Sequence, residues 1–162
     1  MAFILENGTG VEGANAYTTA AAVRSYWLDR GVTLSQTDAH VEAAIIVSSQ
    51  YVDFNNAFKG FKVNFNQGLA WPRYGIENVP SDAVPVQVQN AVAEYTKRQL
   101  AAPLQPDVDP LTIKRKKVKA DVVESEIEYQ DGAGYYGVKS YPLADGYLKP
   151  LLKTGGLGRV GC

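Results

Sequence analysis

The chain has 162 residues, of which 46% are hydrophobic and 20% charged, and this is the composition of an ordinary globular domain. Its formal net charge of −1 lacks the basic excess that a protein gripping a nucleic-acid backbone usually carries. The one cysteine, Cys162, excludes an internal disulfide, and no apolar run approaches the roughly 20 residues of a membrane helix. We therefore expect one domain, residues 1–162, that does not contact a membrane.

Two amphipathic helices are predicted in the first third of the chain. The first covers about residues 18–30, with Thr18 or Thr19 as its cap and Gly31 as its left-handed stop. The second covers residues 36–54 and repeats apolar residues with the helical period. The side chains expected to face inward are Val41, Ala44, Ile45, Ser48 and Val52.

A third helix is predicted after an irregular stretch. Residues 55–80 are interrupted by asparagine, glycine and proline, which favours a loop or a short hairpin. The third helix is expected to start near Ser81 or Asp82, with Pro85 in its first turn, and to run through about residue 102.

The last third of the chain has a different character. Prolines predict a stiff connector over residues 103–110, and residues 111–131 have the pattern of a β arm. Residues 132–162 hold a predicted short helix, Leu143 to Leu152, before a glycine-rich tail. The predicted fold is mainly α. It is a small helical bundle, with a body at about residues 17–102, of three main helices plus a short C-terminal helix. An extended β-strand or hairpin arm and flexible N- and C-terminal arms complete it.

The β arm carries a block of basic residues followed by a block of acidic ones. One interpretation is a hairpin that turns near Ala120 and neutralises its own charge across the strands. The other is that the basic half of one copy pairs with the acidic half of the next, which builds a ring if the rotation closes. The candidate interface residues are Lys114, Arg115, Lys116, Lys117, Lys119, Glu124, Glu126 and Glu128.

Aromatic and cationic residues alternate between residues 58 and 74. A single-strand binder uses such a mixture to stack bases and to follow the phosphates. The alternative, which we favour, is that the rings fill the core under a long loop. The candidates for stacking are Phe58, Phe61, Trp71 and Arg73.

No catalytic, cofactor or metal site is predicted, and we expect that the protein is not an enzyme. The single histidine, His40, has no partner at helical spacing and is expected on a helix surface. The run from Gly8 to Gly13 matches the letters of the dinucleotide-binding motif, but no strand–helix–strand unit surrounds it.

Several stretches, taken in order, resemble the head–tail connector adaptors of tailed bacteriophages. Members of that family often carry the label DnaT-like single-stranded-DNA-binding protein. The most specific stretch runs from Gln67 to Arg73, with the sequence Gln-Gly-Leu-Ala-Trp-Pro-Arg. The other matching stretches are Glu6 to Tyr17, Asp29 to Gly31, Glu42 to Asp53, Phe58 to Gly60, Val79 to Pro85, Lys116 to Val118, Glu124 to Tyr129 and Leu148 to Leu152.

The resemblance implies a structural virion protein. It would form a ring of about twelve copies between the portal protein and the next stopper, neck or tail protein. Genomic DNA would pass through the lumen without specific binding. The ring would be assembled in the host cytoplasm and lie in the neck of the virion. The residues that would dock on the portal are Tyr147, Leu148, Leu151, Leu152 and Arg159.

The alternative is a single-stranded-DNA-binding protein that acts in replication. It is motivated by the aromatic–cationic stretch and by the family label. The sequence favours the adaptor, because the charge of the whole chain is wrong for a DNA-binding surface.

Overall fold

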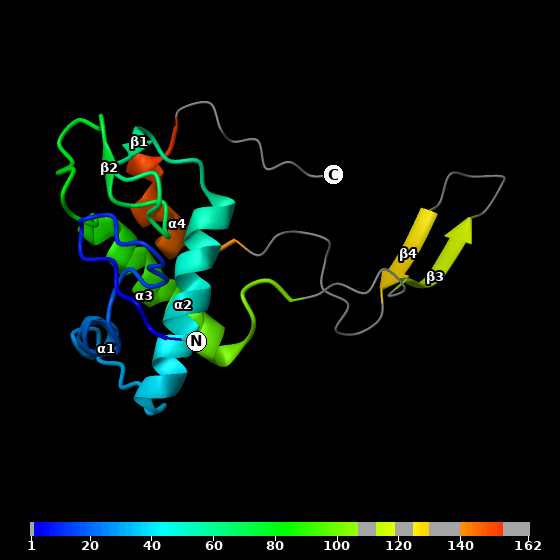
Figure 1. The fold of residues 1–162 in the computed structure, drawn as a ribbon. Helices are drawn as coiled ribbons and strands as arrows, with labels where there is room; N and C mark the ends of the chain where they lie inside the picture. Colours follow the sequence, from blue (N-terminus) through cyan, green and yellow to red (C-terminus); the bar gives the residue numbers. More distant parts are fainter. Residues whose placement is uncertain (1, 107–112, 119–124, 130–139, 154–162) are drawn as a thin grey trace. The chain divides into compact units, whose positions relative to one another are not determined.

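The computed structural model describes residues 2–106, 113–118, 125–129 and 140–153. It divides the chain into two compact units, one made of Met1–Leu104 with Ser140–Cys162 and the other of Gln105–Lys139. The first unit, which we call the body, contains the four α-helices labelled in Figure 1. The second contains the strand pair β3–β4. The predicted fold class, a small and mainly α bundle, is confirmed. In the described segments no helix is long and apolar enough to cross a membrane.

Helix α1 spans Ala20–Leu28 and has the predicted termini. The Thr19 side chain accepts a hydrogen bond from the Ala22 amide, and Gly31 has a φ of +72° just beyond the helix. Only glycine adopts this backbone angle readily, so the chain turns there. Val23 and Trp27 are buried against the rest of the body.

Helix α2 spans Asp38–Asn55 and is capped by Thr37. All five residues of the predicted inward stripe are buried, as the helical period requires. His40 lies on the exposed side of the first turn, where the sequence placed it.

Helix α3 spans Val86–Ala101 and starts later than predicted. The amides of Val88 and Gln89 bond to the Pro85 carbonyl, so Pro85 is the N-cap and the turn at Ser81 and Asp82 precedes the helix. Proline suits this position because its missing N–H would have no partner in the first turn. The helix packs against α1, α2 and α4.

Helix α4 spans Pro142–Leu148 and continues into the 3-10 helix η1, Lys149–Leu151. This agrees with the short C-terminal helix that the sequence predicts. Ala144, Leu148 and Leu151 are buried, which fixes this segment on the body.

The N-terminal residues 2–17 do not form a free arm. Leu5 pairs with Ala16 in a parallel bridge, and Ala14, Ala16 and Tyr17 are buried in the core. The sequence predicts a flexible N-terminal arm, but the body of the same chain covers the apolar residues of this segment. The sequence pattern missed this, since the small residues of the segment have no regular period.

In the second unit, β3 (Ile113–Val118) and β4 (Ser125–Tyr129) pair antiparallel. Arg115 lies opposite Glu128, and Lys117 opposite Glu126. This register confirms the hairpin within one chain. Pairing between copies stays a prediction. The predicted turn at Ala120 and the candidates Lys119 and Glu124 lie outside the described residues.

Candidate functional site

A short hairpin emerges from the body between α2 and α3. Its strands are β1, Phe61–Lys62, and β2, Arg73–Tyr74, in an antiparallel register that places Phe61 opposite Tyr74 and Lys62 opposite Arg73. Gly60, with a φ of +67°, precedes β1, and a β-carbon there would lie 2.3 Å from the Tyr74 carbonyl oxygen. Only glycine allows the two strands to approach so closely at this corner.

The base of the hairpin is held by a buried aromatic pair. Trp71 is fully buried and meets the buried ring of Phe58 edge to face, with 5.4 Å between the ring centroids. The buried side chain of Gln67 adds three hydrogen bonds. Its amide nitrogen donates to the carbonyls of Leu69 and Pro72, and its oxygen accepts from the Asn64 amide. These contacts give the hairpin a rigid base.

Three aromatic rings remain on the surface between residues 58 and 74. The exposed fractions are 67% for Phe61, 97% for Phe65 and 51% for Tyr74. The Phe61 and Tyr74 rings lie side by side, with 5.7 Å between their centroids. Aromatic rings this exposed are unusual on a surface with no partner, because burying each would remove a large apolar area from water.

The segment is cationic as well as aromatic. Residues 54–76 contain Lys59, Lys62 and Arg73 and no acidic residue, which gives three positive charges in a chain with a net charge of −1. The Arg73 guanidinium donates to the carbonyls of Lys59, Gly60 and Ala70, so it ties the hairpin together. Burial lowers its pKa from the usual value, although arginine keeps its proton at any physiological pH. Lys62 is exposed beside it.

A half-buried carboxylate lies behind these cations. Asp53 accepts hydrogen bonds from the Tyr17 hydroxyl at 2.6 Å and from the Ala70 amide at 2.8 Å. Burial raises the pKa of Asp53 to about 6, and the bond from Tyr17 and the charges of Lys62 and Arg73 partly oppose this rise. Asp53 thus connects the last turn of α2 to the loop under the hairpin.

The glycine run near the N-terminus also binds an anion, but one from its own sequence. The Glu6 carboxylate accepts hydrogen bonds from the amides of Gly8, Gly10 and Val11, at 2.9, 3.0 and 2.8 Å. Neighbouring backbone amides that converge in this way form an anion-binding nest. Because Glu6 fills it, the nest stabilises the N-terminal segment.

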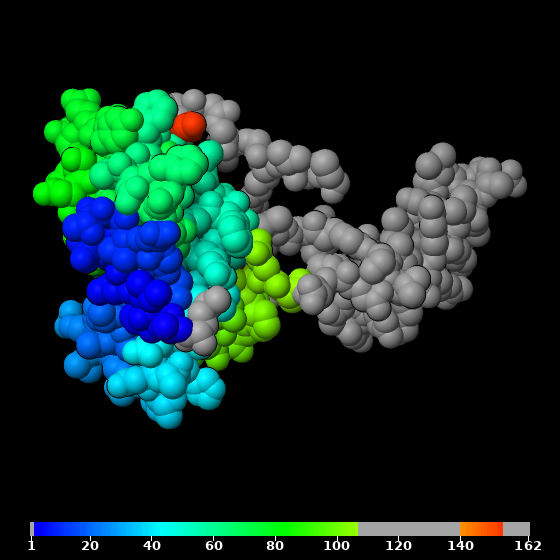
Figure 2. All heavy atoms as spheres, in the orientation of Figure 1, coloured from blue at the N-terminus to red at the C-terminus, as the bar shows by residue number. Residues whose placement is uncertain are grey.

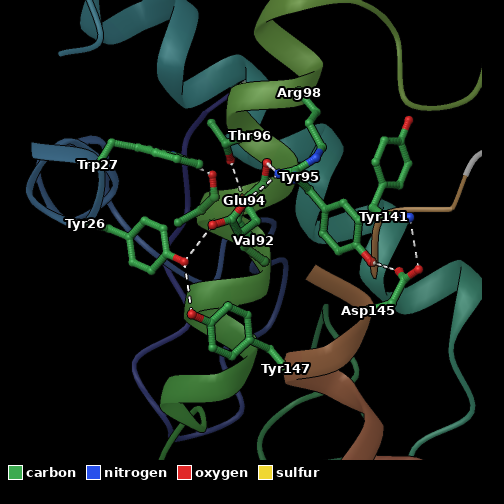
Figure 3. Close-up of polar contacts among 11 residues, drawn as sticks. Tyr26, Trp27, Val92, Glu94, Tyr95, Thr96, Arg98, Tyr141, Asp145 and Tyr147 are labelled. Atoms are coloured by element: carbon green, nitrogen blue, oxygen red, sulfur yellow. Dashed lines mark hydrogen bonds and ion pairs between the residues drawn. The ribbon is translucent and has the colours of Figure 1, made fainter. Parts of the chain in front are cut away.

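Helix α4 is held on the body by the polar network in Figure 3. The Tyr95 hydroxyl donates to the Asp145 carboxylate, and the Tyr26 hydroxyl donates to the buried Glu94 at 2.8 Å and lies 3.2 Å from the Tyr147 hydroxyl. Burial is the main cause that raises the pKa of the Tyr95 and Tyr26 phenols. Sequence reasoning missed Glu94, which lies on the inward face of α3 and also pairs with Arg98.

The family model described as "Putative DnaT-like ssDNA binding protein" matches residues 1–161. The chain belongs to this family. Comparison with curated proteins and with solved structures gave no match.

The family match corrects the interpretation of the chain as a phage head–tail adaptor. The match is to a DnaT-like family whose description specifies binding to single-stranded DNA, and nothing in it indicates a connector between a portal and a tail. The predicted ring, its portal and tail partners, and the unbound DNA in its lumen therefore have no support. The resemblance failed because no single motif in the chain was specific to an adaptor.

Most of the residues predicted to dock on a portal are buried or half-buried in the body of this DnaT-like chain. Leu148 and Leu151 are buried in its own core, Leu152 is half-buried, and the Tyr147 hydroxyl meets Tyr26. Arg159 lies outside the described residues. The docking role came from the resemblance alone, and the spacing of these leucines is that of the ordinary inward face of a helix.

The four candidates for base stacking divide into two groups. Phe58 and Trp71 are core residues that no base can reach, as the favoured interpretation of this stretch predicts. Phe61 is exposed as a stacking ring must be, whereas Arg73 lies opposite Lys62 and its guanidinium is hydrogen-bonded to carbonyls. Sequence reasoning did not select Phe65 and Tyr74. The alternation of ring and cation in Phe61-Lys62 and Arg73-Tyr74 was the available signal.

Proposed function

We propose that this protein binds single-stranded DNA on the β1–β2 hairpin, with bases stacked on Phe61 and Tyr74. The carrying observation is that these two rings are paired across the strands, are more than half exposed and lie 5.7 Å apart. Base stacking on exposed aromatic side chains is the common device of single-strand binders. The description of the family supports the same activity.

The local charge supports this assignment better than the net charge of the chain does. A phosphate backbone responds to the charges within about a Debye length, roughly 8–10 Å at physiological salt. Within residues 54–76 all the charged side chains are positive, and the Asp53 carboxylate near Lys62 and Arg73 is half-buried. The near-neutral composition of the whole chain therefore does not argue against a cationic DNA-binding surface on one hairpin.

The chemistry of the hairpin favours unpaired bases without strong sequence preference. An aromatic side chain stacks on the flat face of a base, and every base has such a face. Inside a duplex the neighbouring bases cover that face. The proposed role is binding, with no catalytic step. We expect oligo-dT to bind more tightly than a duplex of the same length.

The test is fluorescence anisotropy of labelled oligo-dT at low salt, with the dT·dA duplex as competitor. Phe61→Ala and Tyr74→Ala should each weaken binding by about tenfold, because one base–ring stack contributes about 1–3 kcal/mol. Leu28→Ala, which removes a 64%-exposed apolar side chain on α1, is the matched control and should leave binding unchanged. In Figure 1, α1 lies at the opposite end of the body from β1 and β2.

Labelled DNA reports binding better than the fluorescence of Trp71 would, because Trp71 is fully buried and a base cannot stack on it. Binding to oligo-dT that survives both ring substitutions would place the site elsewhere. No binding of oligo-dT by the unaltered protein would refute the function itself.

A further inference from the structure

The segment Lys149–Lys153 lies alongside the residues that lead into β1. Leu152 pairs antiparallel with Phe58, the Lys59 amide donates to the Leu151 carbonyl at 2.9 Å, and the Lys153 amide donates to the Ala57 carbonyl at 3.0 Å. Figure 2 shows the end of this segment, in red, against the body. The C-terminal part of the body therefore borders the hairpin that carries the exposed rings.

This segment adds positive charge where the hairpin already has an excess. Lys149 and Lys153 are exposed, and in the described part of the chain neither ammonium group has a hydrogen-bond or ion-pair partner. The Lys59 ammonium group, from the residue two positions before β1, donates to the Pro150 carbonyl at 2.9 Å. No acidic residue occurs between Asp145 and Lys153. Cations gathered without acids repel one another, and an anionic ligand would relieve that repulsion.

The two lysines sit on a fixed part of the structure. Leu148 and Leu151 are buried, and the Tyr95–Asp145 hydrogen bond ties α4 to α3 (Figure 3). Charges that are already in place lose less freedom on binding than charges on a free tail, so they contribute more to affinity.

We propose that Lys149 and Lys153 contact the phosphates of the same single strand whose bases stack on the β1–β2 hairpin. This inference rests on the proposed function and extends it to a second segment of the chain. That segment is distant in sequence from the hairpin: Lys59 and Pro150, which are hydrogen-bonded, are 91 positions apart. The ligand chemistry is a run of phosphodiesters next to unpaired bases.

The test is the salt dependence of oligo-dT binding by the full chain carrying both Lys149→Gln and Lys153→Gln. Each phosphate contact to a single strand contributes about 0.7 to the slope of log K against log salt concentration, so the slope should become shallower by about 1.4. Glutamine keeps most of the side-chain length and removes only the charge. Because both ammonium groups are exposed, the thermal midpoint should hardly change.

The matched control carries Arg30→Gln and Lys97→Gln, which removes the same charge from the turn after α1 and from α3. These cations lie over the rings of Tyr26 and Trp27, away from the hairpin. The control should keep the original slope. If both double variants reduce the slope equally, only net charge matters and the assignment of Lys149 and Lys153 is wrong.

The outcomes also separate this inference from the proposed function. An unchanged slope in the Lys149 and Lys153 variant, together with weakened binding in Phe61→Ala, would overturn the inference and leave the function standing. Absence of oligo-dT binding by the unaltered protein would remove both.

Discussion

Tyr17 and Asp53 are 36 positions apart in sequence, and the hydroxyl of the first donates a 2.6 Å hydrogen bond to the carboxylate of the second. The same hydroxyl accepts a bond from the Trp71 amide at 3.1 Å. Burial is the main cause that raises the pKa of Tyr17 well above its usual value, and the nearby Asp53 charge adds to this. One phenol thus joins the N-terminal segment, the end of α2 and the base of the β1–β2 hairpin.

Replacing Tyr17 with phenylalanine should lower the free energy of unfolding by about 1–3 kcal/mol. The change leaves the buried Trp71 amide without its acceptor and Asp53 without one of its two donors, and orphaned buried groups are expensive. Urea denaturation would measure the loss. Tyr74→Phe, on the surface, is the control and should be close to neutral. Equal stability of the two variants would show that the bond of Tyr17 has no net effect.

The stability of the protein should depend on pH through Asp53. Its pKa is raised to about 6 in the fold, against 3.8 for the free side chain. Between these values the folded state binds a proton that the unfolded state has released, so this group makes stability fall as pH rises from about 4 to about 6. Asp53→Asn should remove that part of the dependence, although it also disturbs the bonds to Tyr17 and Ala70.

Urea midpoints between pH 4 and pH 7 would test this for the unaltered protein and for Asp53→Asn. Asp29→Asn, an exposed acid at the end of α1, serves as the control and should follow the original curve. A curve for Asp53→Asn that parallels the original one would contradict the raised pKa.

Two glycines of the hairpin allow a matched comparison. Gly60 and Gly75 both have positive φ angles, +67° and +79°. A β-carbon at Gly60 would meet the Tyr74 carbonyl, whereas nothing lies within 4 Å at Gly75. Gly75→Ala should therefore cost only the backbone strain, about 1–2 kcal/mol, and Gly60→Ala should cost more. Thermal midpoints would rank them, and the opposite order would show that the hairpin adapts at Gly60.

The stability of the glycine run near the N-terminus should depend on the charge of Glu6. Glu6→Gln replaces a carboxylate that accepts three amide bonds with an amide that can accept through one oxygen only. We expect a loss of about 1–3 kcal/mol in the free energy of unfolding. Glu12→Gln, at an exposed position of the same run, should be nearly neutral. Proteolysis of the first 17 residues would report whether the segment loosens.

The helices could be predicted from the sequence because their causes are local. Thr19 and Gly31 bound α1, and the spacing of Val41, Ile45 and Val52 places one face of α2 inward. A helix repeats its environment every 3.6 residues, so a short window of sequence contains the information. The start of α3 differs from the prediction, because Ser81, Asp82 and Pro85 are all acceptable starts by sequence and the helix begins after Pro85.

Local sequence does not determine which of the rings between residues 58 and 74 are buried and which are exposed. Phe58 and Trp71 became core while Phe61 and Tyr74 stayed on the surface, although all four belong to one irregular stretch. With no regular period, the sequence did not distinguish a buried ring from an exposed one. The composition alone identified an aromatic and cationic segment.

The sequence by itself determined that this chain is a mainly α domain with an aromatic and cationic segment between its second and third helices. The tertiary structure decided which rings of that segment face water and which lysines lie beside them. Lys149 and Lys153 join the hairpin only because Leu148 and Leu151 bury themselves against the body and bring a distant part of the chain back to Phe58. Such contacts are set by packing between remote segments, and no sequence window spans them.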